Sequence, residues 1–86
     1  MSPHDRLCEV LRARSVRRER VMLASGRESD FYVDARQTTL WAEGAFLVAG
    51  LILDRLRPEV LGVGGPVTGA DPIAGAVAFR MGALSA

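Results

Sequence analysis

The segment from Val60 to Ala78, which reads VLGVGGPVTGADPIAGAVA, has the residue types and spacing of an anion-binding site. An apolar run passes through a glycine-rich turn into the start of a helix. This arrangement gathers unshielded backbone N–H groups and the positive end of a helix dipole at one place. Thr68 would add a hydroxyl, and Gly69 and Ala70 would add N–H groups. A second interpretation stays open, in which the turn only joins a strand tightly to a helix and its glycines serve packing.

Two familiar nucleotide-binding motifs are excluded in this segment. The dinucleotide pattern needs a glycine where Val67 stands. A Walker A loop would fit the separation of Gly64 and Gly69, but Ala70 and Asp71 follow where that motif needs a lysine and a hydroxyl residue. The chain contains no lysine, so neither a lysine phosphate clamp nor a Schiff base can come from it.

A second group of residues with binding chemistry is the stretch SGRESDFYVD, from Ser25 to Asp34. Arg27 offers a planar fork of five N–H donors that suits phosphate or carboxylate. Phe31 and Tyr32 follow it and could hold a planar anionic ligand against their rings. The alternative interpretation is a solvated hairpin tip with Phe31 or Tyr32 facing the core.

Composition limits the remaining functional classes. The 86 residues are 49% hydrophobic and 24% charged with a net charge of +1, which is typical of one globular domain at most. The arginine-rich stretch from Arg12 to Arg20 has no interleaved aromatic residue, which favours a solvated helix end over nucleic-acid binding. Cys8 is the only cysteine, so an intramolecular disulfide or a cysteine metal cluster is excluded. The N-terminal residues lack the apolar run of a signal peptide, and the run Ala45 to Leu53 is too short to span a bilayer, so we expect a cytoplasmic protein with no membrane partner.

The elements that must position these groups follow from periodicity and capping signals. Ser2, Pro3 and Asp5 predict the start of a first helix, and Pro58 predicts the end of the second. In chain order we expect a helix over Pro3 to Ala13, strands over Glu19 to Ala24 and Asp30 to Ala35 joined by a polar loop, a mostly buried helix over Trp41 to Leu56, a strand over Val60 to Gly64, and a helix from Asp71 to about Met81. The last strand is of the continuous apolar type that parallel sheets use, yet the chain offers it no parallel neighbour.

Three stretches together, LASGRESDFYVDAR, WAEGAFLVAG and GVGGPVTGADPIAGAVA, resemble the N-terminal part of the orotate phosphoribosyltransferases, a family of type I phosphoribosyltransferases. The resemblance covers about Val21 to Phe79. It implies an incomplete α/β domain in which a helix and hairpin (residues 1–40) form a hood over the active site, and a helix-strand-helix unit (residues 41–86) begins a Rossmann-like parallel core.

The resemblance implies a reaction and a set of contacts. In that family orotate attacks the anomeric carbon of phosphoribosyl pyrophosphate, with magnesium present, to give orotidine monophosphate and pyrophosphate in pyrimidine biosynthesis. A homodimer is implied as well. The implied orotate side consists of Ser25, Gly26, Arg27, Phe31, Tyr32 and Val33. The implied phosphoribosyl pyrophosphate side consists of Ala24, Gly65, Thr68, Gly69 and Ala70.

The chain also departs from the family pattern. Ala24 and Gly69 stand where many members carry lysine. The basic mobile loop and the acidic phosphoribosyl pyrophosphate signature of the family have no counterpart here, so we assign no catalytic residue and no metal ligand to this chain. We therefore expect it to be inactive alone. The alternative hypothesis is a non-catalytic truncated homologue that acts as an interaction or regulatory module.

Overall fold

The computed structural model describes residues 1–85. Its first helix, α1, runs from Pro3 to Arg14 and begins as the sequence predicts, with the Ser2 hydroxyl accepting a hydrogen bond from the backbone N–H of Asp5 (3.1 Å). Pro3 fits in the first turn because an N–H there would have no partner in the helix. Ser15 follows the helix and donates its own N–H to the Leu11 carbonyl (2.9 Å).

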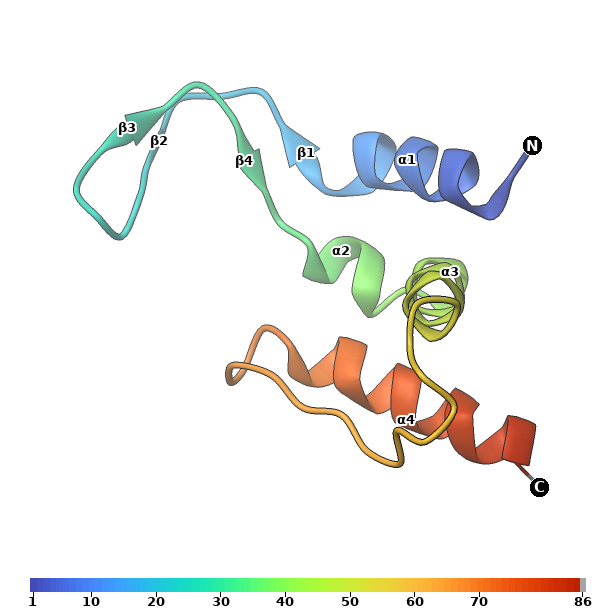
Figure 1. Cartoon of the computed structure of the whole chain (residues 1–86). Coiled ribbons are helices and arrows are strands. Elements are labelled where there is room, and N and C mark those ends of the chain that lie inside the picture. Colours follow the sequence, from blue (N-terminus) through green and yellow to red (C-terminus); the bar gives the residue numbers. More distant parts are fainter. Residues whose placement is uncertain (86) are drawn as a thin grey trace.

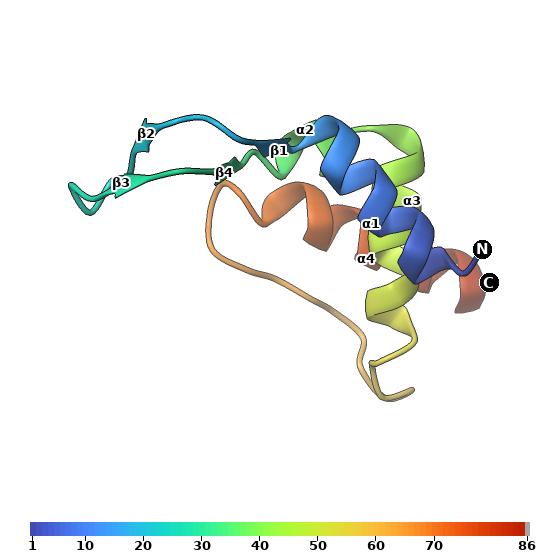
Figure 2. The same cartoon turned by 90° about the horizontal axis from the view of Figure 1, so that it is seen from above.

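A hairpin arm, residues 16–33, follows α1 and projects away from the other helices (Figures 1 and 2). Near its root, β1 (Val16–Arg17) pairs antiparallel with β4 (Tyr32–Val33), and farther out β2 (Val21–Met22) pairs with β3 (Glu28–Ser29). The predicted hairpin is therefore confirmed, but its strands are short and two of them lie outside the predicted ranges, β1 before Glu19 and β3 in the predicted loop. A two-stranded ribbon is marginally stable by itself in water, so the position of the arm depends on what holds its root.

Three helices form the body beside the arm: α2 (Arg36–Thr39), α3 (Ala42–Leu53) and α4 (Asp71–Ser85). The middle helix, α3, packs against both α1 and α4, and α2 packs on α3. Val10 of α1, Ala49 of α3 and Val77 of α4 are each buried and form the small core where these helices meet. The α3 and α4 predictions are confirmed apart from their ends, whereas α2 was not predicted. The prediction that α3 is mostly buried is wrong in the described structure, since only Gly44 and Ala49 of this helix are buried and Phe46 is 60% exposed.

The predicted strand at Val60 to Gly64 is wrong for the part of the chain that the structure describes. Residues 60–64 form no strand, and both of the two-stranded sheets lie in the arm. A strand exists only where a neighbour pairs with its backbone groups, and none is available to this segment. The structure is thus mixed helix with small antiparallel sheets, and the start of a parallel core is not formed.

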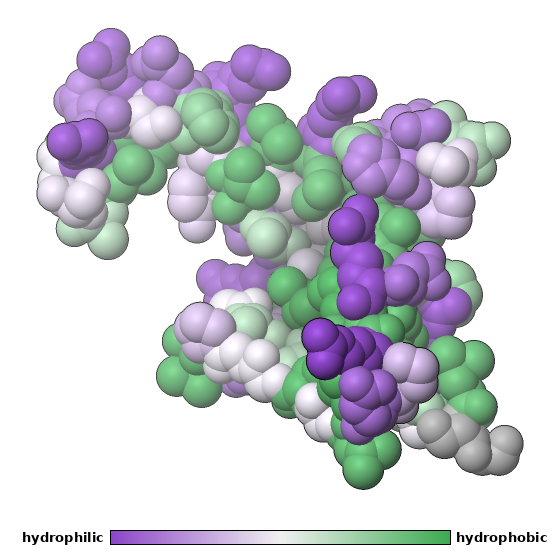
Figure 3. Space-filling view, in the orientation of Figure 1, coloured by the Kyte–Doolittle hydropathy of each residue, from purple (hydrophilic) through white to green (hydrophobic). Residues whose placement is uncertain are grey.

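Apolar surface is exposed on several parts of the molecule (Figure 3). Leu61 and Val67 in the connection between α3 and α4 are 94% and 83% exposed, and Phe79 of α4 is 81% exposed. These side chains bury little surface in the described fold and leave apolar surface available for contact. None of the helices within residues 1–85 combines the length and apolar character that crossing a membrane requires.

Candidate functional site

The tip of the arm presents the Ser25, Gly26 and Arg27 loop to solvent. Two hydrogen bonds close this loop, from Leu23 N–H to the Arg27 carbonyl (2.8 Å) and from Gly26 N–H to the Leu23 carbonyl (2.9 Å). Gly26 adopts a φ of 87°, a conformation that other residues adopt at a cost. Within residues 1–85 the Arg27 side chain has no ion-pair or hydrogen-bond partner, so its guanidinium is available to an anion.

Phe31, Tyr32 and Val33 lie on the arm between its tip and its root. They are 55%, 43% and 43% exposed, which contradicts the interpretation that an aromatic ring of this hairpin faces the core. Tyr32 pairs with Arg17 across the β1–β4 ladder. The backbone of Phe31 is held by the Ser29 hydroxyl, which donates to the Phe31 carbonyl (2.8 Å) and accepts from its N–H (3.3 Å). Two rings are therefore displayed on a fixed backbone.

The glycine turn before α4 is built by two internal hydrogen bonds. Ala70 donates its N–H to the Pro66 carbonyl (3.1 Å), and Asp71 donates to the Thr68 carbonyl (3.2 Å). The expectation that Ala70 offers an N–H to a ligand is therefore wrong, because that group is already used. The Thr68 hydroxyl and the Gly69 N–H have no partner within the described residues, so they are the donors that this turn can offer.

Packing explains one glycine of this turn and not the others. A Cβ at Gly65 would lie 2.6 Å from the Ala70 Cβ, so a side chain at Gly65 would force the turn open. At Gly62, Gly64 and Gly69 a Cβ would meet nothing within 4 Å. In the described part of the chain, the interpretation that the glycines serve only packing thus applies to Gly65 alone. The open space at Gly69 is what close approach of a phosphate to the backbone requires.

The arm and the glycine turn lie on the same side of the body. The turn before α4 lies well below β4 in Figure 1, and in the view from above in Figure 2 it lies beneath the β4 end of the arm. The two groups of predicted site residues, within 24–33 and 65–70, are far apart in the sequence and still lie on one side of the body. Ala24 is the exception within its group, since it lies on the arm beside Ser25 and not at the glycine turn.

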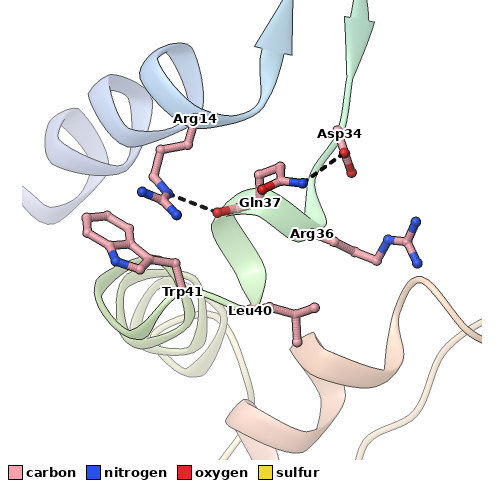
Figure 4. A pocket seen from close by; sticks show the side chains of 6 residues that line it. All are labelled: Arg14, Asp34, Arg36, Gln37, Leu40 and Trp41. Atoms are coloured by element: carbon pink, nitrogen blue, oxygen red, sulfur yellow. Dashed lines mark hydrogen bonds between the residues drawn. The ribbon is translucent and has the colours of Figure 1, made fainter.

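An open depression of about 360 Å³ at the root of the arm was missed by the sequence analysis (Figure 4). The Arg14 guanidinium stacks on the Trp41 ring at 4.2 Å from its centroid and donates from Nε to the Gln37 carbonyl (3.0 Å). Gln37 in turn donates from Nε2 to Asp34 Oδ2 (3.3 Å). The residues that line it are Arg14, Asp34, Arg36, Gln37, Leu40 and Trp41. The four-residue helix α2 brings them together, and its sequence RQTT is too short to carry a periodic signal.

The described residues hold no candidate metal centre. Within residues 1–85 no group of three or more His, Cys, Asp or Glu side chains is placed to hold a metal ion. The ion pair between Arg20 and Glu28 across the arm (2.7 Å) is largely solvent-exposed. The site therefore offers arginine, aromatic and backbone groups, which suit a planar anion and a phosphate.

Comparisons with known proteins give a consistent result. The orotate phosphoribosyltransferase of Sorangium cellulosum is 46% identical over 80 residues, which are 91% of this chain and 42% of that protein. That of Rhodopseudomonas palustris strain TIE-1 is 49% identical over 74 residues, which are 85% of this chain and 40% of that protein. No family model matches the chain.

Solved structures agree with these relatives. The orotate phosphoribosyltransferase of Mycobacterium tuberculosis H37Rv, in complex with Fe(III) dicitrate, superposes with a TM-score of 0.78 at 39% identity, over 88% of this chain and 46% of that one. A structure of the same enzyme with inorganic phosphate gives a TM-score of 0.75. The resemblance inferred from the sequence is confirmed over most of this chain, which spans less than half the length of these relatives.

Proposed function

We propose that this chain supplies one part of an orotate phosphoribosyltransferase active site. Two relatives are 46% and 49% identical to this chain over the aligned residues, which make up most of its length. The aligned residues cover 42% and 40% of the lengths of those relatives. The observation that carries the proposal is that the exposed aromatic strand and the open glycine turn lie on the same side of the body (Figures 1 and 2). The reaction is transfer of phosphoribosyl from phosphoribosyl pyrophosphate to orotate.

The arm forms the orotate side of the site. Orotate is a planar ring that carries a carboxylate, so it needs a flat apolar wall and a fixed cation. The rings of Phe31 and Tyr32 supply the wall, and the unpaired guanidinium of Arg27 supplies the cation. Ser25, Gly26 and Val33 complete this side by shaping the loop and the strand.

The glycine turn forms the phosphoribosyl pyrophosphate side. Thr68 donates its hydroxyl and Gly69 its N–H to phosphate oxygens, next to the positive end of the α4 dipole. Gly65 keeps the turn closed, and Ala70 holds it through its bond to Pro66. In the reaction a bond forms from an orotate ring nitrogen to the anomeric carbon while the bond from that carbon to the pyrophosphate oxygen breaks, and the proton on that nitrogen is released.

Magnesium fits this site only as a partner of the substrate. The described residues contain no cluster of metal-binding side chains, and Mg²⁺ commonly binds through substrate phosphates and water. Magnesium would neutralise charge on the departing pyrophosphate. The chain's own groups would hold the phosphates that carry the ion.

The remaining fold belongs to the whole enzyme. There residues 1–40 act as the hood, and residues 41–86 begin a Rossmann-like core in which the extended segment 60–64 becomes a strand beside parallel neighbours. The whole enzyme is a cytoplasmic homodimer that binds no nucleic acid or membrane. The 86-residue chain alone should show no turnover with orotate, phosphoribosyl pyrophosphate and magnesium, because no group in it stabilises the leaving pyrophosphate sufficiently.

A second candidate function, a non-catalytic interaction module, is favoured by the exposed apolar residues Leu61 and Val67. Such a module would dock on a homologous full-length enzyme through this surface. Light scattering of the purified chain, alone and mixed with the Mycobacterium tuberculosis enzyme, tests it. A mixed species supports the module, and two unchanged separate species exclude it.

The test of the enzymatic proposal is a chimera. Residues 21–79 replace the matching segment of the Mycobacterium tuberculosis enzyme, and turnover of orotate is measured. We expect a chimera with measurable activity and a loss of at least tenfold in activity for Arg27→Ala. Arg18→Ala is the matched control because Arg18 is an exposed arginine on the same arm. An inactive but folded chimera, or equal effects of the two substitutions, would refute the proposal.

A further inference from the structure

Two buried hydroxyl groups join the ends of the hairpin arm. Ser15 directly precedes β1, and Thr38 of α2 lies five residues beyond β4. Both residues are 0% exposed, and their hydroxyl oxygens lie 2.5 Å apart. The Ser15 carbonyl also accepts the Asp34 N–H (2.9 Å), where the chain returns from the arm. The two ends of the arm are thus fastened to each other inside the body.

A third residue, Gly44, packs against the backbone of Thr38. Gly44 of α3 is buried, and a Cβ at this position would overlap the carbonyl oxygen of Thr38. The helix α2 therefore packs directly on the backbone of α3 at Thr38, the residue whose hydroxyl bonds to Ser15. We call Ser15, Thr38 and Gly44 the root clamp. It connects the end of α1, the helix α2 and the helix α3.

The arm has little else to set its direction. Beyond α1, its chain neighbour, the strands of the arm make no extensive contact with the helices in the described part of the chain. Figure 2 shows the arm reaching away from the body. The arm spans residues 16–33, so each of its two sides is roughly 25–30 Å long, and a tilt of about 5° at its root displaces the tip by about 2–3 Å. Small errors at the root become large errors at Arg27.

We propose that the root clamp is a positioning device that fixes the direction in which the aromatic strand and the Arg27 loop project from the helices of the body. A buried hydroxyl pair is otherwise unexpected at this place, because an apolar pair of the same shape would fold as well without needing a directed bond. What the hydrogen bond adds is a fixed distance and angle between α1 and α2. Its consequence for ligand binding rests on the proposed function, whereas its consequence for the direction of the arm does not.

The experiment measures the direction of the arm. Spin labels are placed at Arg12→Cys in α1 and Met22→Cys in β2, both exposed positions, in a Cys8→Ser background, and the distance distribution is recorded by pulsed electron resonance. We expect Ser15→Ala, Thr38→Val and the double variant each to widen this distribution at least twofold. Thr38→Ser keeps the hydroxyl and should restore the original width.

Thr39 provides the matched control. Its hydroxyl is buried beside Thr38 and has no hydrogen-bond partner in the structure, so Thr39→Val removes a buried hydroxyl without removing a bond. Thr39→Val should leave the distribution unchanged. A double variant that keeps helical circular dichroism and the original distribution would overturn the proposal, and so would equal broadening by Thr39→Val. If Ser15→Ala fails to fold, the comparison of Thr38→Val with Thr38→Ser decides.

A second readout separates this proposal from the proposed function. Titration of the chain without spin labels with orotate should give a dissociation constant about tenfold higher for the double variant than for the original chain. The reason is that a displacement of about an ångström strongly weakens a positioned contact. If the folded chimera does not turn over orotate while the distances change, the proposed function fails and the clamp stands. If orotate binds equally to all variants and the distances do not change, the clamp fails.

Discussion

Arg6 of α1 and Glu43 of α3 form a two-point ion pair, with Arg6 Nε 2.7 Å from Glu43 Oε2 and Arg6 Nη2 2.8 Å from Glu43 Oε1. Both side chains are partly exposed, at 43% and 39%. The two residues are 37 positions apart in the sequence, and the ion pair joins their helices. It lies on the side of α3 that faces α1, and it complements the small apolar contact of Val10 with the core.

The ion pair predicts a pH dependence of stability. Its hydrogen bond and charge lower the pKa of Glu43 below the ordinary value of 4.5, and they raise the pKa of Arg6. A carboxyl whose pKa is lower in the folded state stabilises the fold above its unfolded pKa, and this contribution disappears as the pH falls through its folded pKa. Glu43→Gln should therefore lower the melting temperature at pH 7 and should match the original chain at strongly acidic pH.

Thermal unfolding across that pH range is the measurement. Glu59→Gln is the control, because the Glu59 contact with Arg57 is long (3.9 Å) and exposed and should contribute little. Equal pH profiles of Glu43→Gln and the original chain would contradict the role of the ion pair.

Two glycines of α3 should respond oppositely to alanine. In a helix interior alanine is favoured over glycine by about 1 kcal/mol. At Gly44 the new methyl would overlap the backbone carbonyl of Thr38, which cannot move without shifting α2, so we expect a net loss of about 1–3 kcal/mol. At Gly50 the methyl would meet only the end of the flexible Arg80 side chain.

Arg80 can swing away from Gly50→Ala at the cost of its bond to the Phe46 carbonyl (3.0 Å) and its stacking on the Phe46 ring (4.0 Å). These exposed contacts are weak, so Gly50→Ala should change stability by no more than about 0.5 kcal/mol. Urea unfolding of both variants gives the comparison. If Gly44→Ala proves as stable as Gly50→Ala, the close packing of α2 on α3 is wrong.

The stacking of Arg14 on Trp41 can be observed directly, since Trp41 is the only tryptophan. Arg14→Ala removes the cover of the indole and should shift its fluorescence emission to longer wavelength. The loss of stability should be about 0.5–1 kcal/mol, as expected for a cation–π contact at an exposed site. Arg12→Ala, on the same exposed end of α1, should change neither quantity. An unchanged spectrum for Arg14→Ala would show that the ring is not covered in solution.

Local signals made most helices predictable. Ser2 and Pro3 specify the start of α1 within its own first turn, and the apolar run around Ala49 specifies α3 without reference to the rest of the fold. The short helix α2 was not predictable because it depends on Thr38 resting on Gly44, a contact between parts of the chain that no sequence period reveals. The types of the binding groups were equally readable from the sequence, including the Arg27 loop and the aromatic strand.

The spatial relations between elements that are distant in the sequence were harder to predict from it. That the arm and the glycine turn lie on one side depends on the root of the arm, where Ser15 and Thr38 meet. The N–H of Ala70 was counted as a ligand donor because the sequence does not show its bond to Pro66. The strand at Val60 to Gly64 failed for a different reason. Its residue types suit a buried parallel strand, but pairing needs neighbours that this chain does not contain.

That failed strand gives the last prediction, in which one substitution has two outcomes. Leu61 is 94% exposed in the described structure, so Leu61→Asp in the isolated chain should alter unfolding by no more than about 0.5 kcal/mol and should reduce self-association in light scattering. In the chimera with the Mycobacterium tuberculosis enzyme, the same residue would lie in a strand buried on both faces. A buried unpaired carboxylate is strongly destabilising, so Leu61→Asp should abolish folding or activity there. Glu59→Gln, two residues earlier and exposed, should be neutral in both settings. A chimera that tolerates Leu61→Asp would mean that residues 60–64 remain outside the sheet even when parallel neighbours are present.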